Sequence, residues 1–308
     1  MRLRLVLAGS ALALGTLLGS GCARLVFGIA NSGLPPPEAT VAFAPDLGLS
    51  LDLYRPQGLG ARTAPVVVFF YGGAWQRGER DQFRFVGRRL AQQGILAIVA
   101  DYRTYPRAMF PDFVDDAARA VAWTHAHARE FGGDPRCQFL AGYSAGAQIA
   151  ALLGTDQRYL EPYGLKPRHL SGVIGLAGPY DFAITGQYTK VFGPPAQWPQ
   201  AQAVNFVDGS EPGFLLIHGD HDRVVEVRDS VELAQKLRRH RVAAELVILP
   251  GAGHAAPLLG LYNPQRAPQV LAAILGFVRA GAREGGAARW GCSTSSRERA
   301  TTASYYGH

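Results

Sequence analysis

The chain contains little cysteine, with only Cys22, Cys137 and Cys292 among 308 residues. So few thiols do not support the disulfide framework of a small secreted scaffold. Long apolar runs are also scarce, and the run over residues 5 to 18 is too short to span a bilayer comfortably. No internal repeat is visible, so a repeat architecture is not expected.

Long basic runs are missing too, although the formal net charge is +7. The short clusters at Arg88 and Arg89, and at Arg238, Arg239 and Arg241, lie on expected helix surfaces. Scattered charge of this kind is typical of a solvated face, whereas a nucleic-acid site needs a basic stripe. Nucleic acid is therefore not expected as a partner.

The N-terminal 22 residues have the pattern of an export signal. Arg2 and Arg4 give a basic start, an apolar stretch follows, and small residues lead to Cys22. The residues before Cys22 resemble a bacterial lipobox, although Gly19 stands where an aliphatic residue is usual. We expect an exported protein, either periplasmic after cleavage nearby or anchored to a membrane through lipidated Cys22.

Composition divides the rest of the chain into three parts. Residues 23 to 39 include three consecutive prolines and are expected to form a linker. Residues 40 to 282 are rich in apolar and aromatic side chains and are expected to fold as one domain. Residues 283 to 308 are small and polar without an apolar period, which predicts a disordered tail.

Within the domain, strand and helix patterns alternate. Apolar runs bounded by turn residues predict strands at 49 to 54, 65 to 71, 95 to 101, 137 to 143, 171 to 177, 213 to 218 and 244 to 249. Helical patterns cover 81 to 93, 112 to 130, 145 to 154, 227 to 240 and 266 to 281. This order predicts an α/β fold with a mainly parallel sheet and helices on both faces. Residues 178 to 212 break the alternation and are expected to form a small lid insertion.

A serine lies at a tight turn between a predicted strand and helix. The segment from Gly142 to Gly146 reads Gly-Tyr-Ser-Ala-Gly, with Ser144 at its centre. Such a nucleophile elbow holds the serine in strained backbone geometry, and small neighbours allow the adjacent segments to approach closely. The positive end of the following helix favours the negative charge that develops in acyl transfer. Ser144 is therefore a candidate nucleophile.

A second glycine-rich turn follows the apolar run at 65 to 70. Its sequence is Tyr-Gly-Gly-Ala-Trp, from Tyr71 to Trp75. Backbone N–H groups of Gly73, and of Gly72 or Ala74, together with that of Ala145, can bind the oxyanion of a tetrahedral intermediate. The alternative is a plain glycine turn.

The base and the acid are expected on later loops at the same sheet edge. His254 follows the strand at 244 to 249 and precedes a final helix, which makes it the candidate base. Asp220 and Asp222 follow the strand at 213 to 218, and either can orient an imidazole. No second cluster complements His218 and these carboxylates, so no metal site is expected.

Several of these motifs together resemble the carboxylesterase and lipase branch of the α/β-hydrolase superfamily. They are Gly-Gly-Ala-Trp at 72 to 75, Asp-Tyr-Arg at 101 to 103, Gly-Asp-Pro at 133 to 135, the Ser144 elbow, the His-Gly-x-x-Asp-x-x-Val pattern at 218 to 225, and Gly-His at 253 to 254. The resemblance covers about residues 40 to 281 and is strongest to proteins like feruloyl esterases, prenylcysteine methylesterases and kynurenine formamidases.

The resemblance implies a triad of Ser144, Asp222 and His254, and so favours Asp222 over Asp220. It also implies oxyanion donors at Gly73, Ala74 and Ala145. Tyr71 departs from the pattern, because many members have histidine there, and a phenol braces the loop through different hydrogen bonds.

The expected function is hydrolysis of a small carboxylic ester through an acyl-enzyme, with no cofactor. Trp75 and Tyr71, with aromatic residues of the insertion, are candidates to line a substrate pocket. An arylformamidase or peptidase with the same triad stays an alternative, as does a surface binding protein that keeps the fold without turnover. Substrate identity and oligomeric state cannot be derived from this sequence.

Overall fold

The structure is a computed structural model that describes residues 27–60 and 62–284. The expected export signal, Cys22 and nearly all of the expected tail lie outside the described residues. Across the described ranges, no helix combines the length and the apolar content that a membrane span requires.

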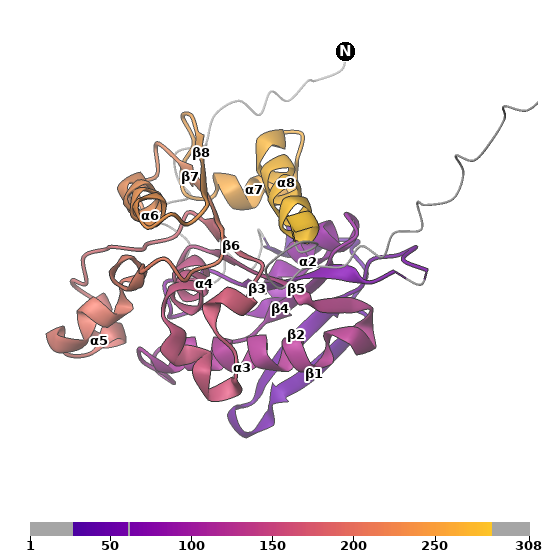
Figure 1. Ribbon diagram of the computed structural model, residues 1–308, viewed down its shortest axis with the longest axis horizontal. Helices are drawn as coiled ribbons and strands as arrows, with labels where there is room; N and C mark the ends of the chain where they lie inside the picture. The colour runs from indigo at the N-terminus through magenta and orange to yellow at the C-terminus, as the bar shows by residue number, and fades with distance from the viewer. Residues whose placement is uncertain (1–26, 61, 285–308) are drawn as a thin grey trace, which may run out of the picture.

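One eight-stranded sheet forms the centre of the described chain (Figure 1). Its strands are β1 (Ala39–Ala44), β2 (Leu49–Tyr54), β3 (Ala64–Phe70), β4 (Leu96–Ala100), β5 (Gly133–Tyr143), β6 (Gly172–Leu176), β7 (Phe214–Gly219) and β8 (Ala244–Leu249). Their spatial order is β1-β2-β4-β3-β5-β6-β7-β8. The pairs β1/β2 and β2/β4 are antiparallel and all the others are parallel. The strands β3 to β8 therefore end at one common edge.

Helices cover both faces of this sheet. They are α2 (Arg84–Ala91), α3 (Asp112–His127), α4 (Ala145–Thr155), α5 (Tyr188–Phe192), α6 (Val227–Arg239), α7 (Ala256–Tyr262) and α8 (Pro268–Glu284). Figure 1 shows α7 and α8 on one side of β7 and β8, and α6 on the other. Every residue of α4 is buried. This accords with its long apolar sequence, because a helix that is apolar on all sides packs in the interior.

The predicted α/β class is confirmed, and each of the seven predicted strands and five predicted helices is present within a few residues of its expected bounds. Among the described strands and α-helices, three were not predicted, namely β1, α5 and α7. The expected insertion lies between β6 and β7 and consists of α5 and short 3₁₀ helices. Its last 3₁₀ helix, Ala203–Phe206, packs against α4 and α6.

One local expectation differs from the structure, and the cysteines add a second detail. Part of the expected linker packs on the domain: the ring of Phe27 lies 4.9 Å from that of Phe83, and Asn31 accepts a hydrogen bond from the Phe85 amide at 3.0 Å. Cys137, buried in β5, is disulfide-bonded, and both other cysteines lie outside the described residues. The low cysteine content excludes a framework of several bridges, but it does not exclude a single one.

Candidate active site

Ser144 occupies a strained turn between β5 and α4. Its φ of 53° and ψ of −120° lie outside the regions that most residues adopt. The turn is held because the Ser144 amide donates to the carbonyl of Leu176 in β6 at 2.8 Å. A Cβ on Gly142 would overlap the carbonyl of Gly146, and a Cβ on Gly146 would overlap that of Phe70. The two glycines therefore allow the close approach that the motif predicted.

The three predicted triad side chains meet at this turn. His254 Nε2 lies 2.9 Å from Ser144 Oγ, and His254 Nδ1 lies 2.7 Å from Asp222 Oδ2. Asp222 follows β7 and His254 follows β8, so loops after two neighbouring strands supply both. The Asp222 side chain is fully buried and that of His254 is 15% exposed. A hydroxyl, an imidazole and a carboxylate are thus linked in series at the sheet edge.

Asp222 is held as a carboxylate. Burial raises its pKa, but hydrogen bonds from His218 and His254 outweigh that effect and keep the pKa well below its usual range. The amides of Val224 and Val225 also donate to Oδ1, at 2.8 and 3.0 Å. A negative charge next to Nδ1 would stabilise a protonated imidazole at His254.

Asp220, the other candidate acid, has a different position. It is exposed, and its Oδ1 accepts a hydrogen bond from the Gly251 amide at 2.7 Å. This bond connects the loop after β7 to the loop after β8. The carboxylate that bonds to His254 is therefore that of Asp222.

The candidate oxyanion loop lies against Ser144. A Cβ on Gly72 would come 3.1 Å from the Ser144 Cβ. Gly73, Ala74 and Trp75 all have positive φ, at 145°, 55° and 57°. Within residues 27–60 and 62–284, no protein acceptor pairs with the amides of Gly73, Ala74 or Ala145. These donors are therefore available to an oxygen atom of a ligand.

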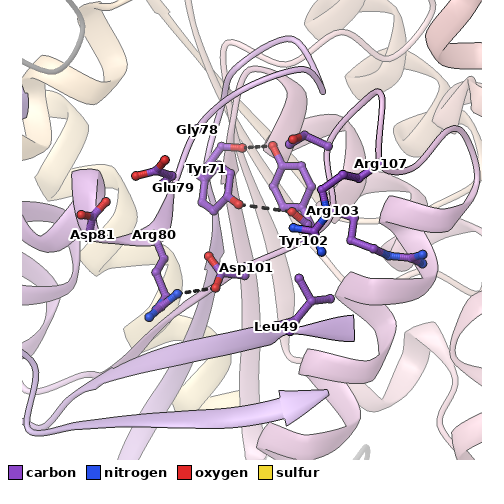
Figure 2. Close-up of a pocket in the computed structure, with 12 residues that line it drawn as sticks. Leu49, Tyr71, Gly78, Glu79, Arg80, Asp81, Asp101, Tyr102, Arg103 and Arg107 are labelled. Atoms are coloured by element: carbon purple, nitrogen blue, oxygen red, sulfur yellow. Dashed lines mark hydrogen bonds and ion pairs between the residues drawn. The ribbon is translucent and has the colours of Figure 1, made fainter. Parts of the chain in front are cut away.

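Tyr71 braces this loop from behind and does not line a pocket at Ser144. Its hydroxyl donates to the Tyr102 carbonyl at 3.3 Å, and the Tyr102 hydroxyl donates to the Tyr71 carbonyl at 2.8 Å. Their rings stack with centroids 4.5 Å apart, and Tyr71 is only 2% exposed. Figure 2 shows this reciprocal pair beside the ion pair of Arg80 and Asp101, in a polar cavity of about 380 Å³. The assignment of Tyr71 to a substrate pocket is therefore corrected.

Trp75, the second candidate pocket residue, packs against the insertion. Its ring stacks on Phe182 at 5.3 Å and meets Tyr188 and Phe192 edge-on at 5.7 and 4.8 Å. Phe192 is fully buried, whereas Phe182 and Tyr188 are partly exposed. Trp75 thus connects the oxyanion loop to the insertion, and only partly exposed members of this aromatic cluster can contact a ligand.

Two residues next to the site were not given a role there by the sequence motifs. Gln148 lies one turn along α4 from Ser144, and His218 contacts Asp222 at 3.0 Å. Both are fully buried polar side chains. The one signal for Gln148 was a polar residue in an otherwise apolar helix. In the described part of the chain, no group of three or more His, Cys, Asp or Glu side chains has an arrangement that could hold a metal ion.

Comparison with known proteins identifies the family of the chain. The BD-FAE family matches residues 51–237. The chain is 32% identical over 242 residues to esterase LipC of Mycobacterium tuberculosis, covering 71% of this chain and 60% of LipC. It is 31% identical over 242 residues to isoprenylcysteine alpha-carbonyl methylesterase ICME of Arabidopsis thaliana, covering 70% of this chain and 55% of that protein. The chain thus spans less than two thirds of the length of these curated relatives.

Solved structures share the fold. Thermogutta terrifontis esterase 2, phosphoramylated by tabun, superposes with a TM-score of 0.66 at 24% identity over 78% of this chain and 95% of that one. An acetyl ester-xyloside bifunctional hydrolase from Caldicellulosiruptor lactoaceticus gives 0.67 at 23% identity over 80% and 99%. The family match covers more than half of the chain, in agreement with the sequence motifs. The chain belongs to the BD-FAE family, in the carboxylesterase branch of the α/β-hydrolases.

Proposed function

We propose that the protein is a serine hydrolase that cleaves a small carboxylic ester through an acyl-enzyme on Ser144. The observation that carries this proposal is the continuous chain from Ser144 Oγ to His254 at 2.9 Å and from His254 to Asp222 at 2.7 Å. An alcohol is a weak nucleophile until a neighbouring base removes its proton. His254 is placed to do so, with Asp222 to stabilise the resulting cation.

The reaction has two acyl-transfer steps. Ser144 Oγ attacks the ester carbonyl while its proton passes to His254 Nε2, and the carbonyl oxygen becomes an oxyanion. His254 then gives that proton to the leaving alcohol, and the acyl group stays on Ser144. Water attacks the acyl-enzyme with His254 again as base, which releases the acid and restores the serine. Both steps balance with the ester, water and the side chains of the protein, so the reaction requires no cofactor.

The oxyanion would be bound by backbone amides of Gly73, Ala74 and Ala145. Support comes from the absence of protein acceptors for these three amides within the described residues. The Ala145 amide also lies at the N-terminus of α4, where the helix dipole favours negative charge. Such donors act strongest on charge that develops in the transition state.

The relatives support ester substrates but do not identify one. LipC is named an esterase, and ICME is named a methylesterase of isoprenylcysteine. The triad geometry supports acyl transfer and leaves the leaving group open, so a formamide or a peptide bond would pass through the same steps. Paired ester and formamide substrates that share one acyl group would separate these activities.

The test combines turnover and covalent labelling. Purified protein is incubated with p-nitrophenyl butyrate, and separately with a fluorophosphonate probe. We expect both hydrolysis and labelling, and we expect Ser144→Ala to abolish both. Ser210→Ala is the matched control, because Ser210 is an exposed serine outside the site. Labelling that persists in Ser144→Ala would reject Ser144 as the nucleophile, and a folded wild type that no acyl size labels would favour a binding protein without turnover.

We further propose that the protein is exported and attached to a membrane through lipidated Cys22. The support is the basic and apolar pattern of residues 1 to 22 and their resemblance to a lipobox. Mass spectrometry of the protein from detergent-extracted membranes would be expected to find Cys22 as an acylated N-terminus. Simple cleavage nearby would instead give an unmodified, soluble chain. If Cys22 is lipidated, the Cys22→Ala variant should no longer be found in the membrane fraction; if the chain is only cleaved, the substitution should not change where the protein is found.

A further inference from the structure

A second histidine lies behind the acid of the triad. His218, in β7, places its Nε2 3.0 Å from Asp222 Oδ2, the same oxygen that receives His254 Nδ1 at 2.7 Å. The side chains of His218 and Asp222 are both fully buried. One carboxylate oxygen is therefore shared between a deep imidazole and the partly exposed imidazole of the catalytic base.

The surroundings of His218 determine its tautomer. Nε2 faces two acceptors, Asp222 Oδ2 at 3.0 Å and the Val225 carbonyl at 3.2 Å. Since neither acceptor can donate a proton, Nε2 carries the hydrogen. Nδ1 lies 2.7 Å from the hydroxyl of Ser230, a buried residue of α6 that donates into the free nitrogen lone pair. Ser230 thus holds the His218 ring with its Nε2–H directed at Asp222.

Every hydrogen-bonding position on the Asp222 carboxylate that faces the protein is used. Oδ1 accepts the amides of Val224 and Val225, and Oδ2 accepts the two imidazoles. A carboxylate with fixed partners on both oxygens cannot rotate away from His254. We propose that His218, kept in one tautomer by Ser230, is a positioning residue that fixes the Asp222 carboxylate and limits how strongly it draws a proton onto His254.

The last part of this proposal follows from hydrogen-bond chemistry. A donor to a carboxylate withdraws part of its negative charge, so each further donor makes the carboxylate a weaker partner for the others. Without His218, Asp222 would stabilise protonated His254 more strongly, and the base would lose its proton at higher pH. A residue that only fills space could not produce this shift.

Other titratable groups surround the pair. Tyr143 from β5 lies with its ring 5.2 Å from that of His254. Asp229 from α6 bonds instead to the Tyr180 amide at 3.1 Å. On the loop of Asp222 itself, Asp220, His221 and Arg223 are exposed or partly exposed. All five are retained in the variants below, so they do not account for a difference between those variants.

The experiment compares His218→Leu, His218→Gln and Ser230→Ala with the wild type. Leu removes the donor to Asp222, whereas the Gln amide can still donate. For each protein, kcat and KM on p-nitrophenyl butyrate are measured from pH 5 to 9, thermal unfolding is followed by circular dichroism, and the His254 pKa is measured by NMR titration of its ring protons.

We expect His218→Leu to lower kcat about 10- to 100-fold with little change in KM, as suits loss of a hydrogen bond to a charged group. We expect its acid limb and its His254 pKa to move to higher pH. Ser230→Ala is expected to change kcat and the His254 pKa in the same directions by smaller amounts. His218→Gln is expected to keep most of the wild-type kcat and most of the wild-type His254 pKa. Ser230→Ala is the milder variant if Leu impairs folding.

Two results would overturn the inference. One is a folded His218→Leu or Ser230→Ala with the kcat and the His254 pKa of the wild type. The other is an equal loss in Leu and Gln, which would mean that His218 only fills space. The inference rests on the proposed function, but the two fail separately: absence of Ser144-dependent turnover in the wild type rejects the function, while the NMR titration tests His218 without turnover.

Discussion

The indole Nε1 of Trp75 donates a hydrogen bond to Gln148 Oε1 across 3.0 Å. The other end of the same side chain, Gln148 Nε2, donates to the Ala201 carbonyl at 2.8 Å. Gln148 is fully buried on α4, one turn beyond Ser144. A single amide thus links the candidate oxyanion loop, helix α4 and the insertion.

Gln148→Leu is expected to weaken the packing of the loop at 72 to 75, helix α4 and the insertion against one another. It leaves a buried indole N–H and a buried carbonyl without partners, which should reduce the free energy of unfolding by about 2 to 4 kcal/mol. We also expect kcat to fall, because the loop that carries Gly73 and Ala74 loses its support. Urea unfolding and turnover measure the two effects. The control is Gln200→Leu on the exposed surface of the insertion; equal effects of both substitutions would argue against the bridge.

Asp222→Asn and Asp220→Asn should separate the two carboxylates. For Asp222→Asn we expect a loss of about 10⁴ in kcat, the size seen when a triad acid is replaced by its amide. Asp220→Asn should stay within about threefold of wild type, because its bond to Gly251 is exposed and contributes little. A large loss in Asp220→Asn alone would reverse the assignment.

The low pKa of Asp222 also determines which group controls activity at acidic pH. Because the folded pKa lies below the unfolded one, its stabilisation is complete above the unfolded value of about 4 and is lost only as the pH falls below that value. The acid limb of kcat/KM should therefore not report protonation of Asp222. In wild type, a limb near pH 4 with full activity at pH 5 would contradict this expectation.

Asp229 should give stability the opposite pH dependence. Burial raises its pKa to about 6, although the Tyr180 amide donates to it. Since the folded protein then holds the proton more tightly than the unfolded chain, stability falls as pH rises from about 4 to 6 and is constant above. This contribution amounts to about 3 kcal/mol at most.

Asp229→Asn removes that titration. Relative to wild type, the variant should gain stability between pH 4.5 and 7, and Asp208→Asn, at an exposed site, should not. Urea unfolding at several pH values gives the difference. A difference between Asp229→Asn and wild type that does not change with pH would show that Asp229 keeps an ordinary pKa.

Gly146→Ala tests the crowding at the elbow. Its Cβ would overlap the carbonyls of Phe70 and Tyr71, so the elbow and the oxyanion loop must separate. We expect a loss of about 1 to 3 kcal/mol in stability, together with lower kcat. Gly276→Ala on α8 is the matched control, because nothing lies within 4 Å of its Cβ, and it should stabilise the helix by about 0.5 to 1 kcal/mol. Thermal unfolding of Gly146→Ala and Gly276→Ala measures the change in stability of each variant.

The sequence was sufficient to predict the strand ends that carry the candidate site, because parallel strands end at one edge and the turn residues that follow them are distinctive. The apolar runs before Gly72, Ser144, Asp222 and His254 marked those strand ends correctly. Strand β1 was missed since its sequence, Ala-Thr-Val-Ala-Phe-Ala, follows prolines at the sheet edge and only its last two residues are buried. Helix α7 has a proline and a glycine within seven residues, and it depends on packing against α2 and α8.

Partners distant in sequence explain the remaining failures. Gln148 bonds to residues 73 positions before it and 53 positions after it, and no local pattern encodes such pairs. Tyr71 was assigned to a pocket because it precedes the oxyanion glycines. Its direction depends on Tyr102, 31 residues away, whose hydroxyl and carbonyl complete the pair.

The position of α7 has one consequence for motion near the base. The helix begins two residues after His254, and from α2 the Arg89 side chain donates to the carbonyls of Leu261 and Tyr262 at its end, at 3.0 and 3.1 Å. The segment that carries the imidazole is therefore anchored both by β8 and by a guanidinium clamp. In native-state hydrogen exchange, amides from 254 to 262 should open as one cooperative unit with the end of α2.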